Sequence, residues 1–225
     1  MKSILLLHGA LGSKAQFAAL TKELEQTKIV YSFNFESHGG SGAKGPFSID
    51  SLVENVRDFM DQNKLDKIDL FGYSMGGYVA LKYALKFPER IGKISTLGTK
   101  FDWTPESAAN EIKRLNPELI ELKVPVFAKL LKAEHHPDDW KELMNNTANM
   151  MLDLGNGSAM TEANFKEISS QVIICRGSND EMVTKAESLK VVQYLQNADY
   201  FELENTPHAL EKVELDKLVA LCIEE

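Results

Sequence analysis

The chain has 225 residues, of which 44% are hydrophobic and 26% are charged, so it is long enough for one large globular domain with a sizeable core. Its formal net charge is −8 and it has no basic run, which excludes a surface built for nucleic acid or for an anionic membrane. No apolar stretch approaches the ~18 residues of a membrane span, and the run Ile4–Leu7 is shorter than the ~7 residues of a minimal signal-peptide core. Two cysteines without metal-type spacing, Cys175 and Cys222, predict free thiols in a reducing, cytoplasmic compartment.

Short apolar segments alternate along the chain with longer amphipathic segments, and this alternation predicts a parallel sheet with helices on both faces. The expected strands are Ser3–Leu7, Ile29–Phe35, Lys67–Phe71, Ile91–Leu97, Gln171–Arg176 and Ala198–Leu203. The expected helices are Lys14–Gln26, Ile49–Lys64, Met75–Phe87, Thr184–Leu195 and Ala209–Ile223. Several of the strands are apolar almost throughout, as strands covered on both faces are.

Residues 101–160 interrupt this alternation because they contain no good strand. Thr104-Pro105 and Asn116-Pro117 each place a capping residue before a proline at the first helical position, and a third helix is expected over Pro137–Leu154. We therefore expect a helical cap at 101–160, inserted between the two parts of a core domain, 1–100 and 161–225. The alternative is that these helices belong to the main core.

The segment Gly72-Tyr73-Ser74-Met75-Gly76-Gly77 follows an expected strand and opens an expected helix. A serine at such a sharp turn is held in a strained conformation, and small residues two places before and after it let the turn close. The helix N-terminus also favours negative charge that develops there. Ser74 is therefore the candidate nucleophile, although a glycine-rich turn that only packs the helix on the sheet would look similar.

Acyl transfer also needs two backbone N–H groups that point at the developing oxyanion. Met75 follows the candidate nucleophile, and His8-Gly9-Ala10-Leu11-Gly12 directly follows the first strand. Met75 and Ala10 are therefore the expected donors. The alternative for the first loop is an ordinary turn at the end of a strand.

A serine nucleophile needs a base, and the base needs a carboxylate that orients it. Asp180 follows the fifth expected strand and His208 follows the sixth. The carboxyl ends of parallel strands meet at one edge of the sheet, so these residues can reach Ser74. Asp102, which follows the fourth strand, is the competing acid.

These motifs together resemble the α/β-hydrolase superfamily, in its small lidded esterase-like branch. The resemblance covers nearly the whole chain and rests on His8-Gly9, 34–41, Gly72–Gly77, Gly177–Asp180 and His208. It implies an α/β-hydrolase fold with a helical cap, Ser74 as nucleophile, His208 as base, Asp180 as acid, and Ala10 with Met75 as oxyanion donors. The chain departs from the family in three ways. The usual N-terminal strand hairpin is missing, and Pro207 replaces a glycine before the histidine. In the segment 34–41, Asn34 or Glu36 stands where the family has Asp, and Ser37 stands where it has Gly before the histidine.

Without that hairpin, about six strands remain, and Ile29–Phe35 becomes an apolar edge that another segment or a second subunit should cover. A homodimer is therefore one expectation. His135-His136 lack a third ligand at usable spacing, so a surface loop is favoured over a metal site. The cap cations could bind a carboxylate substrate, although a solvated helix face also explains them. They are Lys113, Arg114, Lys123, Lys129 and Lys132.

The expected activity is the hydrolysis of a carboxylic ester with a small or medium acyl group, through an acyl-enzyme and without metal or cofactor. The expected partner is a small-molecule substrate, with no nucleic acid and no membrane. The alternatives are a thioesterase, a C–C hydrolase or an elimination enzyme with the same residues, and a ligand-binding sensor that does not turn over.

Two apolar clusters of the expected cap must be shielded from water, and the nearest surface that can do so is the face of the core that carries Ser74. One is the helical stripe of Trp140, Met144, Met150 and Met151, and the other contains Val126, Phe127, Leu130 and Leu131. Most of these side chains should form the core of the cap. The rest should line an apolar substrate pocket, in which flexible methionines tolerate varied ligand shapes.

Overall fold

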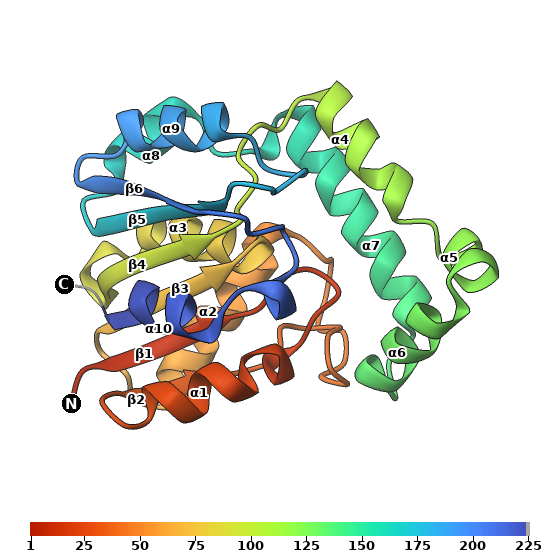
Figure 1. Ribbon diagram of the computed structural model, residues 1–225, viewed down its shortest axis with the longest axis horizontal. Coiled ribbons are helices and arrows are strands. Elements are labelled where there is room, and N and C mark those ends of the chain that lie inside the picture. The colour runs from red at the N-terminus through yellow and green to blue at the C-terminus, as the bar shows by residue number, and fades with distance from the viewer. Residues whose placement is uncertain (224–225) are drawn as a thin grey trace.

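Six parallel strands form one sheet in the computed structural model, which describes residues 1–223 (Figure 1). The strand order is β2-β1-β3-β4-β5-β6, and each neighbouring pair is parallel. The strands are β1 (Ser3–Leu7), β2 (Ile29–Ser32), β3 (Ile68–Tyr73), β4 (Ile91–Leu97), β5 (Gln171–Gly177) and β6 (Ala198–Leu203). The predicted six-stranded parallel α/β fold is confirmed.

Helices cover both faces of this sheet, because alternate side chains of each strand point to opposite faces (Figure 1). In β1, Ile4 and Leu6 pack in the apolar cluster that holds α1 (Ala18–Leu24) and α10 (Leu215–Ile223). Leu5 and Leu7 pack in the opposite cluster. The helices on that second face are α2 (Ile49–Gln62), α3 (Met75–Lys86), α8 (Glu162–Glu167) and α9 (Lys185–Tyr194).

Short helical turns connect or extend several of the helices and strands. The 3₁₀ turns are η1 (Lys14–Phe17), η2 (Pro88–Arg90), η3 (Ile112–Arg114) and η5 (Leu210–Lys212). Two of them, η1 and η5, fall where the sequence predicted the first turns of α1 and α10. None of the helices within residues 1–223 is long and apolar enough to cross a membrane.

The edge strand β2 is shorter than predicted. The chain leaves the sheet after Ser32, because Phe33 stacks on Phe59 of α2 and the Phe35 N–H donates to His8 Nε2 at 3.1 Å. Ile29 is 45% exposed, and among the described strands β2 pairs only with β1. No strand of residues 1–223 therefore provides the cover that the sequence analysis expected for this edge.

Four helices lie beyond the carboxyl ends of the strands and contain no strand between them (Figure 1). They are α4 (Pro105–Glu111), α5 (Pro117–Lys123), α6 (Pro125–His135) and α7 (Trp140–Asp153). Thr104 and Asn116 accept hydrogen bonds from backbone N–H groups at the starts of α4 and α5. The helix α7 begins at Trp140, three residues later than predicted, because Asp139 caps it by accepting from the Lys141 N–H at 2.9 Å.

The helix α7 ends at Asp153, one residue before the predicted end at Leu154, and the π turn η4 (Leu154–Ser158) follows it directly. Gly157 has a φ of 111°, and this backbone conformation ends the turn. On α6, Val126 is 70% exposed and Leu130 is 62% exposed. Phe127 is exposed as well, so the expectation that the second apolar cluster is covered is wrong for these three side chains, whereas Leu131 is buried as expected.

Candidate active site

Ser74 lies at the sharp turn between β3 and α3, with a φ of 51° and a ψ of −115°. A non-glycine residue with a positive φ is strained, so neighbouring groups must hold it in place. The Ser74 N–H donates to the carbonyl of Leu97 at 2.8 Å, and Thr99 Oγ1 donates to the Ser74 carbonyl at 3.0 Å. The end of β4 and the residues after it therefore fix the turn from one side.

Gly72 and Gly76 let this turn close. A Cβ on Gly76 would lie 2.1 Å from the carbonyl oxygen of Leu7, and a Cβ on Gly72 would lie 2.4 Å from the Cα of Gly77. Both contacts are with backbone, which cannot move aside as a flexible side chain can. The helix α3 therefore approaches β1 and β3 closely enough to present Ser74 at the carboxyl edge of the sheet.

We predict that Gly76→Ala lowers the free energy of unfolding by about 1–3 kcal/mol, although alanine is normally about 1 kcal/mol better than glycine inside a helix. The added methyl group must push α3 away from β1. Gly45→Ala is the matched control, because nothing lies within 4 Å of a Cβ built on Gly45. Urea unfolding of both variants tests this, and a Gly76→Ala protein as stable as the native one would contradict the close approach.

His208 lies between Ser74 and Asp180. Its Nε2 is 3.2 Å from Ser74 Oγ, and its Nδ1 is 2.7 Å from Asp180 Oδ2. The side chain of His208 is 19% exposed and that of Asp180 is 1% exposed. The structure thus brings the three predicted residues together from three separate loops.

The partners of Asp180 determine which protons His208 carries. Asp180 Oδ1 accepts from the N–H groups of Met182 at 2.8 Å and Val183 at 3.0 Å, so Oδ2 is left to accept from His208 Nδ1. Burial alone would raise the pKa of Asp180, but the bond from His208 and these two N–H donors outweigh it and lower the pKa. Because Nδ1 carries the proton of a neutral His208, Nε2 is free to accept the proton of Ser74.

Close backbone contacts place the His208 loop. A Cβ on Gly177 would lie 2.1 Å from the Thr206 carbonyl oxygen, and the Tyr73 hydroxyl donates to the His208 carbonyl at 3.0 Å. The competing acid, Asp102, is exposed, and its N–H donates to Glu187 Oε1 at 3.3 Å. It has no recorded contact with His208.

The backbone N–H groups of Ala10 and Met75 are free in the structure. Both residues line the same cavity as Ser74 and His208. Neither N–H donates to any acceptor of residues 1–223, which is expected for Met75 as the first residue of α3. These two groups are thus available to a negatively charged oxygen beside Ser74.

The cavity over Ser74 is narrow, with a volume of about 40 Å³. Its lining residues are Ala10, Ile49, Ser74, Met75, Tyr78, Lys100, Trp103, Met150, Met151, Leu154, Met182 and His208. Of the four predicted pocket residues, Met150 and Met151 line it. Trp140 and Met144 instead pack with Ala128 and Leu131 of α6, because they lie nearer the start of α7, where α6 covers the helix.

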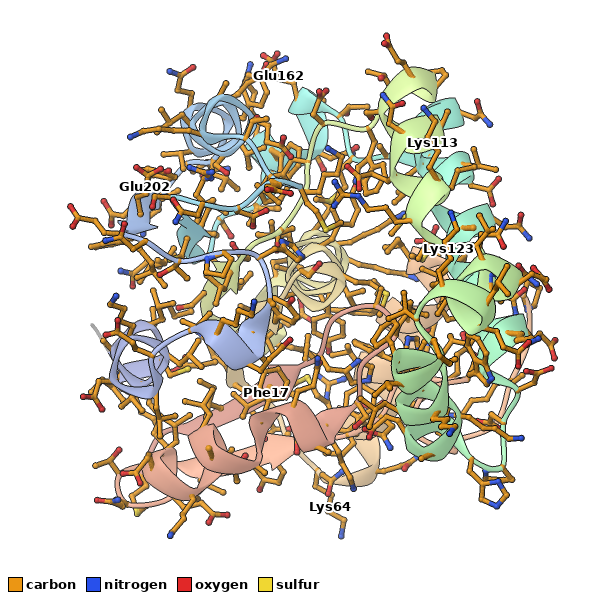
Figure 2. All side chains as sticks on the ribbon, turned by 45° about the vertical axis from the view of Figure 1, so that its right-hand side comes forward. Phe17, Lys64, Lys113, Lys123, Glu162 and Glu202 are labelled. Carbon is orange, nitrogen blue, oxygen red and sulfur yellow. The ribbon has the colours of Figure 1, made fainter. Side chains whose placement is uncertain are left out.

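The cations that the sequence analysis named on residues 113–132 do not line this cavity. Lys113 and Lys123, labelled in Figure 2, are exposed, as are Arg114, Lys129 and Lys132. The cation that does line the cavity is Lys100, which sequence reasoning missed. Its position directly after β4, next to Thr99, could have indicated it, because the carboxyl ends of the strands form the site.

A cluster of three buried histidines joins the end of α6 to the loops that follow β1 and β2, beside the site. The rings of His8 and His38 lie 4.9 Å apart, and those of His38 and His135 lie 5.8 Å apart. His135 accepts from the Gly39 N–H at 2.9 Å and donates to the Leu11 carbonyl at 3.1 Å. The prediction that His135 lies in a surface loop is therefore wrong, since both ring nitrogens bond to core loops and the residue is fully buried.

Burial lowers the pKa of His8 to about 4, and it lowers the pKa of His38 and of His135 as well. Below pH 6.5 the unfolded chain binds protons that these folded histidines do not, so the free energy of unfolding falls as the pH falls toward about 4. The slope approaches about 1.4 kcal/mol per pH unit for each such histidine. We predict that urea unfolding between pH 7.5 and pH 5 shows this loss.

The neighbouring residue His136 provides the control for this pH dependence, because it is exposed. His135→Gln should reduce the slope, whereas His136→Gln should not. Equal slopes in both variants would show that His135 does not contribute to the acid sensitivity.

Comparison with known proteins places this geometry in a family. The family model described as "alpha/beta hydrolase fold" matches residues 2–211. A probable alcohol acetyltransferase of Wickerhamomyces anomalus is 39% identical over 90 residues, which are 39% of this chain and 26% of that protein. An abhydrolase domain-containing protein of Schizosaccharomyces pombe is 33% identical over 93 residues, 40% of this chain and 34% of that protein. The matched segment thus spans about a third or less of these relatives.

Solved structures share the fold over nearly the whole chain. NosK from Streptomyces actuosus is 16% identical, with a TM-score of 0.85, over 98% of this chain and 95% of that one. The enol-lactonase from Burkholderia xenovorans is 21% identical, with a TM-score of 0.77, over 99% of this chain and 92% of that one. At these identities the likeness shows the fold alone.

Proposed function

Because the chain belongs to the alpha/beta hydrolase family, we propose that it is a serine hydrolase that cleaves carboxylic esters through an acyl-enzyme. The observation that carries this proposal is the line of contacts from Ser74 through His208 to Asp180. In this proposal residues 101–160 act as a cap over the substrate, with Met150 and Met151 of α7 in the wall of the cavity.

The first half of the reaction forms the acyl-enzyme. Ser74 Oγ attacks the ester carbonyl carbon while His208 Nε2 accepts the hydroxyl proton. The carbonyl oxygen becomes an oxyanion, which accepts from the free N–H groups of Met75 and Ala10 and is favoured by the N-terminus of α3. His208 then gives its proton to the leaving alcohol as the bond between the carbonyl carbon and the ester oxygen breaks.

The second half repeats these steps with water. Water attacks the acyl carbon, His208 accepts its proton, and the proton returns to Ser74 Oγ as the acid leaves. Asp180 stays ionised throughout, holds the ring of His208 in the useful tautomer and stabilises the imidazolium form. The lowered pKa of Asp180 supports this role.

A second candidate is acyl transfer to an alcohol, in which an alcohol replaces water in the second half. The names of the relatives favour it, since the first of them is a probable alcohol acetyltransferase. An assay with added ethanol distinguishes the two activities, because transfer yields an ethyl ester whereas hydrolysis yields only free acid. Gas chromatography of both products measures the partition between them.

We predict that kcat/KM for p-nitrophenyl esters rises from acetate toward short or medium acyl chains and falls for long ones. Each buried CH₂ adds at most ~0.8 kcal/mol, or about fourfold. A cavity of about 40 Å³ takes only a few non-hydrogen atoms, because one water needs about 10–15 Å³ by the same measure. The optimum should therefore lie at the short end of this range.

A pair of methionine variants tests whether this cavity sets the preference. Met151→Ala widens the cavity and should move the optimum to longer chains. Met144→Ala removes a side chain from the core of the cap and should lower stability without moving the optimum. A flat profile in the native protein, or an optimum that moves equally in both variants, would contradict the apolar pocket.

A further inference from the structure

Lys100 is a largely buried cation in an otherwise mainly apolar cavity. It follows β4 in the chain, two residues after Gly98. Gly98 lies beside the catalytic candidates, because a Cβ added to it would be 3.3 Å from both His208 Nδ1 and Asp180 Oδ2. The side chain of Lys100 is 12% exposed and lines the cavity beside Ser74 and His208. Among the lining residues it is the only lysine or arginine, surrounded by methionine, leucine, isoleucine and aromatic side chains.

The ammonium group of Lys100 is only partly satisfied by the protein. It has three N–H donors, and one of them reaches the Met182 carbonyl at a long 3.3 Å. The nearest carboxylate oxygen, Oε1 of Glu111, is 3.7 Å away, beyond hydrogen-bond range. Its Nζ also lies 5.7 Å from the centre of the Trp103 ring. Donors therefore remain without a strong acceptor among residues 1–223.

Glu111, which faces Lys100 from α4, is also incompletely paired. Its side chain is 12% exposed, and its Oε2 is buried without a hydrogen-bond partner in the described part of the chain. Buried charges are normally held by close partners, because removal from water is costly. The two side chains are within ion-pair distance, at 3.7 Å, but they do not form the direct hydrogen bond that would satisfy both.

We propose that Lys100 binds a carboxylate on the substrate, so that the preferred substrates are short esters that carry an acid group. This rests on the proposed ester hydrolysis by Ser74. A carboxylate gives the ammonium the strong, short, charge-assisted hydrogen bond that it lacks. The narrow cavity places this carboxylate a few bonds from the reacting carbonyl, either in the acyl part or in the alcohol part of the ester.

A purely structural role for Lys100 makes a different prediction. In that case Lys100 only ties α4 of the cap, through Glu111, to the loop that contains Met182. Removal of either Lys100 or Glu111 would then loosen the cap and affect charged and neutral substrates alike. If Lys100 binds a carboxylate, the two removals act in opposite directions, because Glu111 competes for the same ammonium.

The experiment compares anionic esters with neutral partners of similar shape. Monoethyl succinate and ethyl methyl succinate place the carboxylate in the acyl part, and butyryl glycolate and its methyl ester place it in the alcohol part. We expect one of the two pairs to show a preference for the anionic member. Lys100→Met should lower kcat/KM for that member about 10- to 100-fold more than for its neutral partner, chiefly through KM. Lys100→Arg should restore part of the preference.

Glu111→Gln is the matched variant, and it should raise the ratio of anionic to neutral kcat/KM. If Lys100→Met and Glu111→Gln each lowered kcat/KM equally for the anionic ester and its neutral partner, the proposal would be overturned. Lys100 would then have only a structural role. A native protein without an anionic preference in either pair would also overturn the proposal. If no ester is turned over, ester hydrolysis fails separately, and calorimetric binding of the same pairs to Ser74→Ala still tests whether Lys100 selects the anion.

Discussion

Replacement of Ser74 by alanine is expected to lower ester turnover by about 10⁴- to 10⁶-fold, because the oxyanion donors and substrate binding alone retain only a small part of the catalysis. The protein should stay folded, since Ser74 Oγ makes one 3.2 Å contact with His208 and the turn is held by backbone groups. Steady-state kcat, together with thermal unfolding of the same sample, tests both expectations.

Ser169→Ala is the matched control for this variant, because Ser169 is exposed and makes no recorded hydrogen bond. It should keep the full activity of the native protein. Unchanged hydrolysis by purified Ser74→Ala would end the serine mechanism. An inactive but unfolded Ser74→Ala would show instead that Ser74 supports the fold.

Asp180→Asn is expected to lower kcat by about 10⁴-fold. The amide of asparagine carries no charge to stabilise the imidazolium, and its NH₂ group favours the tautomer in which Nε2 of His208 is protonated and cannot accept from Ser74. The side chain of Asp180 is almost fully buried, so water cannot replace the lost carboxylate.

Asp102→Asn provides the matched comparison, because Asp102 is the other acid that follows a neighbouring strand. Its exposed side chain has no recorded contact with His208, so kcat should stay within about twofold of the native value. A larger loss in Asp102→Asn than in Asp180→Asn would reverse the assignment of the acid.

Much of the sheet could be predicted from local pattern. The expected bounds of β1, β4 and β6 coincide with the observed ones, because each of these strands lies between polar or turn-forming residues. The turn at Ser74 was also predictable, since the strand, the glycines and the helix follow one another within a few residues. The proximity of His208 and Asp180 was predictable from the topology, because the carboxyl ends of parallel strands lie at one edge of the sheet.

For residues 101–160, the sequence predicted that helices form but not how they pack. An amphipathic helix shows which side chains are apolar, but not whether the body, another cap helix or solvent covers them. The four apolar side chains predicted on one face of α7 therefore have two different surroundings. Met150 and Met151 line the cavity, whereas Trp140 and Met144 pack under α6. His135 and Lys100 were missed because their burial depends on loops that lie far away in the sequence.

The measurement that tests the central claim most directly is labelling with a fluorophosphonate, which reacts with an activated serine. The protein is labelled to completion, digested and mapped by mass spectrometry, while residual ester hydrolysis is followed in the same sample. We predict one adduct per chain, located on Ser74, with activity lost in proportion to labelling and no adduct in Ser74→Ala. Full activity in the labelled protein, or an adduct on another residue that accounts for the loss, would contradict the account.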